Sequence, residues 1–371
     1  QIPVTITLYD AYGSIIHQEE IWNWDFGLEF SLPEAGNYEL VISAHLIDFP
    51  DSELENTNLV RSLQITAEEL VEIFFPDPNL DQVVREYIGK NSGEPIYASE
   101  VLGIEEFHAE WRNISDISGI EHLSNLRNLY INENSISDIS SLASLTKLEY
   151  LNIETNNISD ISILTQLQNL WGLSTGRNPI IDFSVVNQIP NLNNLALVGL
   201  GLEDSDILFL GDNPNLQMIW LNQNSITNLT PLASIVYLNS LDFSYNLVTD
   251  LTPMQNLSNL TGIWGSGNQI TTLAPLQYLT NLSALFVGGN QITDLNPLAS
   301  LTQITHLDCS SNQIADISAL EALTNLQWMS VSNNLVEDIL PLVNNTAIDS
   351  GDYADISYNF LDLTPEGTDM T

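Results

Sequence analysis

The chain has 371 residues, 44% of them hydrophobic, which is enough for more than one domain and a large buried core. It carries 48 acidic and only 7 basic residues, for a formal net charge of −41. Such a surface repels nucleic acids and anionic membranes, and no apolar run is long enough to cross a bilayer. The chain begins at Gln1 without a signal peptide, so we expect a mature or trimmed form.

Residues 1–70 are expected to form a small all-β domain. Val4–Leu8 and Phe26–Leu32 alternate apolar and polar residues, Tyr38–Ala44 follows a turn signal, and Leu59–Ile65 completes the set. Short alternating segments of this kind are typical of an antiparallel sandwich, and the architecture resembles the immunoglobulin-like modules of bacterial surface proteins.

Residues 71–103 are expected to form a helical cap. Asp77 is a suitable N-cap, Pro78 suits the first helical position, and Gly89 is a natural stop. Between them, Val83, Val84, Tyr87 and Ile88 form an apolar stripe that would pack on the next part of the chain. A second short helix is predicted at Ser99–Leu102.

Residues 104–361 repeat one pattern, L-x-x-L-x-L-x-x-N-x-I, over about twelve turns, ahead of a polar tail at 362–371. The asparagine of the pattern returns every 22 residues within two runs, at Asn134, Asn156 and Asn178, and at Asn224, Asn246, Asn268, Asn290, Asn312 and Asn334. This period is that of a leucine-rich repeat, so we predict an α/β solenoid: a right-handed horseshoe with a parallel sheet on its concave side. The first and last turns depart from the pattern, as end caps do.

Each repeat should contribute one short strand whose leucines point inward and stack on those of the next turn. The asparagine should also point inward, where its amide can bond backbone groups of neighbouring turns. One turn breaks the pattern: Leu200 stands at the asparagine position, and an insertion follows within 203–215. We interpret the insertion as a convex bulge; a binding protrusion is the alternative.

The Phe75-Pro76-Asp77 helix start, followed by Asp-rich 22-residue repeats, resembles the internalin family of bacterial surface proteins. The resemblance covers about 72–361. It implies a macromolecule-binding protein, often using the concave face, without catalytic residues. Internalins usually carry an immunoglobulin-like module after the repeats, whereas here about ten residues follow them and no wall anchor is visible. Host-cell invasion is therefore not inferred.

Catalytic and metal-binding patterns are lacking. The five histidines are scattered, and neither a Cys pair, a phosphate loop nor a nucleophile elbow occurs. Cys309 falls at a core position and is interpreted as an apolar filler. His306 and Asp308 are expected on one strand, and Asp242 lies on the same outward row three turns away. This separation is too large for a convincing metal site. We predict no enzyme activity, no metal site and no cofactor, with calcium left open because of the acidic charge.

The outward residues of the strands are the candidate partner-binding site. Large aromatic side chains at outward positions are unnecessary for a solenoid and typical of binding surfaces. Gly262, Ala284 and Gly288 are expected to leave room for a partner to approach. The alternative is that the rings stack on each other and stiffen the sheet. The candidate residues are Met218, Trp220, Asp242, Trp264, Phe286, His306, Asp308 and Trp328, with Tyr130 and Tyr150 in a second cluster.

We therefore predict a non-catalytic bacterial protein, secreted or attached to the cell surface, with lipoprotein attachment as one option. It is expected to be a monomer that recognises a protein partner through a patch around Trp220, Trp264 and Phe286. A carbohydrate ligand is the second hypothesis, because tryptophan faces stack on sugar rings. A rigid spacer within a larger surface protein is the third.

Overall fold

The computed structural model describes residues 71–346, 348 and 351–361, and four strands nearer the N-terminus. Contacts divide the chain into two units, Gln1–Ile73 with Pro95–Glu100, and Phe74–Glu94 with Val101–Thr371.

The N-terminal unit contains a four-stranded antiparallel sheet in the order β2-β1-β3-β4. Its strands are β1 (Val4–Tyr9), β2 (Ile15–Ile21), β3 (Gly36–His45) and β4 (Asn58–Ala67). Three of the predicted strands are confirmed. The fourth, Phe26–Leu32, lies outside the described residues, and β2 was missed because its sequence does not alternate. A second small sheet pairs β5 (Glu72–Ile73) with β6 (Ile96–Tyr97). The immunoglobulin-like assignment stays a prediction.

The predicted cap helix is confirmed as α1 (Pro78–Ile88), and the second helix as α2 (Ala98–Val101). Asp77 caps α1 by accepting hydrogen bonds from the backbone N–H groups of Asn79 and Leu80, and Gly89 ends the helix in the left-handed conformation (φ 69°). The other carboxylate oxygen of Asp77 accepts bonds from Ser115 and from the N–H of Asp116. One side chain therefore fixes both the helix and the first repeat.

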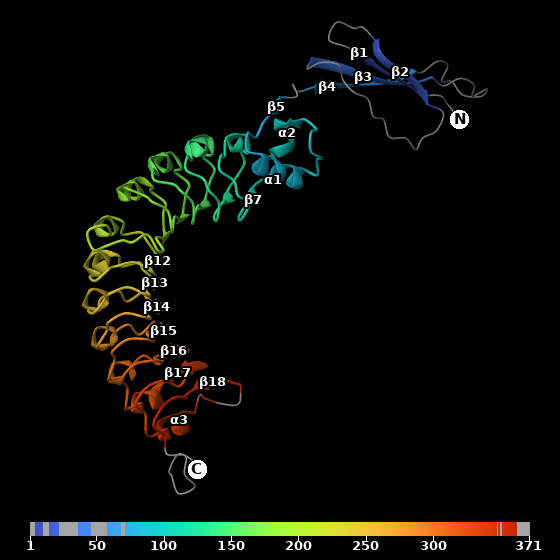
Figure 1. Cartoon of the computed structure of the whole chain (residues 1–371). Helices are drawn as coiled ribbons and strands as arrows, with labels where there is room; N and C mark the ends of the chain where they lie inside the picture. Colours follow the sequence, from blue (N-terminus) through green and yellow to red (C-terminus); the bar gives the residue numbers. More distant parts are fainter. Residues whose placement is uncertain are drawn as a thin grey trace, which may run out of the picture. The chain divides into compact units, whose positions relative to one another are not determined.

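The repeats form a parallel sheet of twelve strands, one per turn, as predicted (Figure 1). The strands are β7 (Glu106–His108), β8 (Asn128–Tyr130), β9 (Tyr150–Asn152), β10 (Gly172–Ser174), β11 (Asn194–Ala196), β12 (Met218–Trp220), β13 (Ser240–Asp242), β14 (Gly262–Trp264), β15 (Ala284–Phe286), β16 (His306–Asp308), β17 (Trp328–Ser330) and β18 (Tyr353–Asp355). Within the repeat unit, these strands line the inner side of the curve and the helical turns line its outer side.

Short 3₁₀ helices make the return path of most turns, because about eleven residues leave no space for a longer helix. They are η1 (Ile120–His122), η2 (Ser140–Ser144), η3 (Ser162–Gln166), η4 (Ser184–Gln188), η5 (Leu208–Asp212), η6 (Thr230–Ser234), η7 (Thr252–Met254), η8 (Ala274–Leu276), η9 (Asn296–Leu298) and η10 (Ser318–Ala322), followed by the α-helix α3 (Leu340–Asn344).

The asparagine ladder behaves as the repeat pattern predicts. Asn246 is representative: its Nδ2 donates to the carbonyls of Leu221, Phe243 and Ser244, and its Oδ1 accepts the N–H of Ile226 one turn earlier. Each asparagine thus satisfies backbone groups of two turns at the bend, where strand pairing has ended. The backbone must turn sharply just before it, so the preceding residue has a positive φ, as at Tyr245 (φ 54°).

The core between sheet and helical turns is continuous and filled by the repeat leucines and isoleucines, nearly all fully buried. Where one turn carries a larger residue, its neighbour compensates. Phe243 replaces an aliphatic residue, and the next turn has Gly265 at the same position. A Cβ atom on Gly265 would lie 2.5 Å from the Phe243 ring. Cys309 occupies this same row and is fully buried, which confirms its interpretation as core.

Candidate partner-binding face

The strand register places all ten predicted site residues at outward positions of the sheet. Trp220, Asp242, Trp264, Phe286 and Asp308 pair in unbroken succession from β12 to β16 and form one row across the sheet. Tyr130 belongs to the same row on β8. The neighbouring row, two residues earlier on each strand, holds Tyr150, Met218, His306 and Trp328. The rows derived from the repeat period are therefore the rows of the structure.

Aromatic rings in the C-terminal half of the face pack on each other in a C-terminal ladder of four. The Trp264 and Phe286 rings are stacked with centroids 5.9 Å apart and planes 6° apart. Phe286 lies 5.8 Å from Trp328, which in turn stacks on Tyr353 at 5.6 Å. The alternative that these rings stiffen the sheet thus has a geometric basis in this half.

The expectation that Gly262 and Gly288 leave room for a partner was wrong. A Cβ atom on Gly262 would lie 2.5 Å from the outer ring atoms of Trp264, and one on Gly288 would lie 2.9 Å from the Asp308 carboxylate and the Ser310 hydroxyl. Neighbouring side chains of the face already fill both spaces. These glycines let Trp264 and Asp308 lie flat against the sheet.

A second, N-terminal ladder runs from the first turn to the fourth. His108 stacks on Tyr130, with centroids 4.4 Å apart and planes 3° apart, Tyr130 lies 5.3 Å from Tyr150, and Tyr150 lies 5.6 Å from Trp171. The two ring nitrogens of His108 contact Glu110 at 2.9 Å and Glu106 at 3.0 Å. The hydrogen bond to Glu110, helped by that to Glu106 and opposed by partial burial, raises the pKa of His108 above its usual value.

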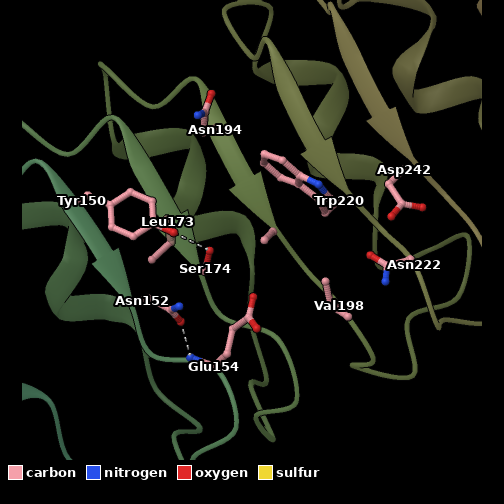
Figure 2. A pocket seen from close by; sticks show the side chains of 11 residues that line it. Tyr150, Asn152, Glu154, Leu173, Ser174, Asn194, Val198, Trp220, Asn222 and Asp242 are labelled. Atoms are coloured by element: carbon pink, nitrogen blue, oxygen red, sulfur yellow. Dashed lines mark hydrogen bonds between the residues drawn. The ribbon is translucent and has the colours of Figure 1, made fainter. Parts of the chain in front are cut away.

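Between the two ladders the face is hollowed into a pocket of about 380 Å³, shown in Figure 2. Tyr150 and Trp220 stand on opposite sides of it, on β9 and β12. The strands between them carry Ser174 and Ala196 in the middle row, and both side chains are buried in the floor. The remaining lining residues are Asn152, Glu154, Leu173, Asn194, Val198, Asn222 and Asp242.

The neighbours of Trp220 in the structure therefore differ from those predicted from the repeat spacing. The predicted patch joined it to Trp264 and Phe286, but Asp242 stands between Trp220 and Trp264 in the row. In the described part of the chain, the Trp220 ring stacks on no other aromatic ring. Its side chain instead borders the pocket (Figure 2). Glu154, Ser174, Asn194, Ala196 and Asn222 were not among the predicted site residues. Two small residues at successive turns between large ones were the signal for the hollow.

The polar groups of the pocket are acceptor-rich. Burial raises the pKa of the Asp242 carboxyl above its usual value, although Ser244 donates a hydrogen bond to it, its N–H lying 2.9 Å from Oδ1. Burial likewise raises the pKa of Glu154, while nearby Arg177 opposes the shift and Glu133 adds to it. Asn222 Oδ1 is buried and accepts no hydrogen bond. The Tyr150 and Ser174 hydroxyls lie 3.3 Å apart.

Residues 71–346, 348 and 351–361 contain no group of three or more His, Cys, Asp and Glu side chains arranged to hold a metal ion. His306 and Asp308 are on β16, three strands from Asp242 on β13, and Thr305 contacts the His306 Nδ1 at 2.9 Å. Burial raises the pKa of the Cys309 thiol, so it is a poor nucleophile.

Known leucine-rich-repeat proteins are similar to this chain in sequence and in fold. A model of paired leucine-rich repeats matches residues 124–166. An internalin from Listeria monocytogenes is 31% identical, and the alignment covers 78% of this chain and 91% of that one with a TM-score of 0.66. The chain belongs to the internalin family.

The functional domain of InlJ, also from Listeria monocytogenes, has the same fold as this chain, with 24% sequence identity and a TM-score of 0.59. The alignment covers 76% of this chain and 60% of that one. A leucine-rich-repeat protein of Leptospira interrogans shares this fold at 22% identity, covering 67% and 65%, with the same TM-score. No curated protein sequence matches the chain. The internalin-type repeat fold supports a role as a protein-interaction or adhesion module.

The irregular turn of this internalin is accommodated on the helical side. Asn224 spans the longer distance by accepting the N–H groups of both Leu200 and Leu202, and Phe209 of η5 is buried against Phe183 with ring centroids 6.0 Å apart. The insertion is therefore packed into the helical layer, as the convex-bulge interpretation expected. None of the described helices is long and apolar enough to cross a membrane.

Proposed function

We propose that this internalin is a non-catalytic bacterial binding protein, secreted or held at the cell surface, that recognises a protein partner through its concave face. The observation that carries the proposal is the pocket between Tyr150 and Trp220, because a folded solenoid gains nothing from a hollow beside a half-buried indole. Partly exposed aromatic side chains around a concavity are the usual energetic centres of protein interfaces. The proposal includes no catalytic step and no cofactor.

Two aromatic ladders flank the pocket and support the same role. Their rings stack or tilt against each other across successive strands, so their positions are fixed before any partner arrives. A preformed surface costs little side-chain entropy on binding. The candidate residues of the C-terminal ladder, Trp264, Phe286 and Trp328, would thus extend the contact area, with Met218 next to Trp220 on β12, while the pocket provides specificity.

The test is binding of the labelled full chain to an arrayed panel of purified extracellular proteins, followed by affinity measurements on each hit. Tyr150→Ala and Trp220→Ala should each weaken a genuine interaction by about thirty-fold, which corresponds to the ~2 kcal/mol threshold of a binding hot spot. The matched control is Tyr278→Ala, an aromatic side chain 73% exposed just after η8 on the helical side. Hits that keep their affinity in both pocket variants would contradict the concave-face proposal.

A carbohydrate ligand is the second candidate, favoured by the amide-bearing side chains Asn152, Asn194 and Asn222 beside the Trp220 ring. Indole faces stack on sugar rings and amides bond hydroxyl groups. A glycan array probed with the same proteins separates the two classes. Glycan binding that is lost in Trp220→Ala, with no protein hit, would favour the sugar. Absence of binding on both the protein array and the glycan array would favour the rigid-spacer hypothesis.

A further inference from the structure

One end of the pocket between Tyr150 and Trp220 combines a carboxylate, an unpartnered amide oxygen and an aromatic ring. This end is formed by Trp220 and Asp242, which pair across β12 and β13, and by Asn222, two residues beyond Trp220 (Figure 2). Asp242 is a carboxylate, the buried Oδ1 of Asn222 accepts no hydrogen bond, and the indole face is a region of negative potential.

The negative charge of Asp242 is not matched by a cation. The carboxylate is half-buried, and the hydrogen bonds that it accepts come from Ser244, close by on its own turn. In the described part of the chain, no Lys, Arg or His side chain forms an ion pair with it. Placing a charge in such a site without a counter-ion costs free energy that a bound cation would recover.

The opposite end of the pocket differs in this respect. Glu154 lies near Arg177, which stabilises its charged form, and Arg177 is itself held by a 2.8 Å hydrogen bond to Gln223. Glu154 therefore has a cation nearby, whereas Asp242 has no ion-pair partner among the described residues. A net charge of −41 adds a long-range field that attracts basic partners and steers them towards the chain.

Resting on the concave-face function proposed above, we propose that this end of the pocket binds a basic side chain of the partner protein, an arginine guanidinium. A guanidinium is planar and can lie over the Trp220 indole while its N–H groups donate to the two carboxylate oxygens of Asp242. Five donors in a rigid fork suit several acceptors around one plane better than a compact lysine ammonium does. The pocket volume of about 380 Å³ accommodates an entire inserted side chain.

The experiment uses the full chain labelled with ¹⁵N at its tryptophan indoles, with the Trp220 Nε1–H resonance assigned through Trp220→Phe. The probes are N-acetyl-L-arginine amide and its uncharged analogue N-acetyl-L-citrulline amide, which has nearly the same shape, at matched ionic strength. The arginine amide should shift the Trp220 resonance saturably, and the citrulline amide should not. An equal response to both probes would overturn the proposal, because the site would then recognise shape rather than charge.

Asp242→Asn should weaken arginine-amide binding at least five-fold, since it removes the charge but keeps the side-chain shape and the acceptor for Ser244. Asp355→Asn is the matched control: Asp355 accepts the N–H of Ser357 in the same way at 3.0 Å but lies on β18, away from the pocket. Unchanged affinity in Asp242→Asn would overturn the proposal.

Two further readouts keep the conclusions separate. Asp242→Asn should melt at the same or a higher temperature than the parent chain, because it removes an unmatched half-buried charge; a lower melting temperature would contradict the proposal by showing that the charge stabilises the fold. If the arginine amide does not bind while Tyr150→Ala and Trp220→Ala still weaken partner binding, only this inference is wrong. If the arginine amide binds while both variants keep their affinity for the partner, the cation site is supported and the proposed concave-face function is wrong.

Discussion

Gly172 lies directly beneath the Tyr150 ring, and a Cβ atom on this glycine would be 2.5 Å from Tyr150 Cδ2. The two residues pair across β9 and β10, so the side chain missing from one strand is the space used by the ring of the other. Tyr150 can therefore lean along the sheet toward Trp171 and form a wall of the pocket. The shape of the candidate site therefore depends on a residue that has no side chain.

Gly172→Ala is expected to turn the Tyr150 ring out of its position and to narrow the pocket. Because the ring and not the backbone must move, the loss of stability should be modest, about 1–3 kcal/mol as for other overpacked sites. Chemical denaturation measures the stability, and partner affinity measures the pocket. Gly103→Ala is the control, since a Cβ atom there meets nothing within 4 Å. Equal partner affinity in both variants would show that the Tyr150 position does not matter.

Asn246→Ala should destabilise the solenoid by at least about 2 kcal/mol. The substitution leaves the buried N–H of Ile226 and three backbone carbonyls without the hydrogen bonds that the Asn246 amide provides. Asn325→Ala removes a similar side chain that makes a single exposed bond of 2.7 Å to the Thr302 carbonyl, and it should cost far less. Urea denaturation of the two variants provides the comparison. Similar midpoints would refute the structural role assigned to the ladder.

His108 should titrate above the ordinary histidine value, since its hydrogen bonds to Glu110 and Glu106 favour the protonated ring. The folded-state pKa is raised, so the stabilisation is complete below about 6.5, the pKa of an unfolded histidine, and is lost as the pH rises through the folded value. An NMR titration of the imidazole measures this pKa, and Glu110→Gln should lower it. A ring that titrates at the ordinary value in the parent chain would contradict the geometry.

Asp77 should titrate below the ordinary aspartate value. Burial raises the pKa of its carboxyl, but backbone hydrogen bonds from Ser115, Asn79, Leu80 and Asp116 together outweigh burial and lower it. Its contribution to stability is therefore present above the unfolded-state pKa of about 3.9 and is lost as the pH falls through the lower folded value.

The Asp77 contribution can be isolated with Asp77→Ala. This variant should lose about 1–2 kcal/mol at pH 7, as other removed helix caps do, and the difference from the parent chain should shrink in acid. Stability measured by denaturation at pH 7 and near pH 2.5 tests both statements. A difference that does not change with pH would mean that the charge of Asp77 is irrelevant to the cap.

Cys309 should resist thiol reagents in the folded chain. Its side chain is fully buried and burial raises the pKa of the thiol, so both access and thiolate are lacking. A colorimetric thiol assay should detect no reaction under native conditions and one equivalent in denaturant. Rapid native labelling would show that the core next to β16 opens more readily than its packing indicates.

Much of this architecture follows from the period of the sequence. Each turn meets only its neighbours, and a 22-residue repeat brings the same position of successive turns together, so the leucine core, the asparagine ladder and the outward rows could all be derived without coordinates. The cap helix could likewise be predicted from Asp77, Pro78 and Gly89, because capping depends on local backbone chemistry.

The grouping of outward side chains into a site was decided by the tertiary structure. The rows of the sheet do not say in which direction each ring leans; that depends on the size of the residue beside it, as with Trp264 over Gly262 and Tyr150 over Gly172. The sequence period therefore placed Trp220 in its row, but only side-chain packing separated it from Trp264 and opened the pocket beside Asp242. Backbone periodicity determines which residues are neighbours, whereas the volumes of those neighbours determine which of them touch.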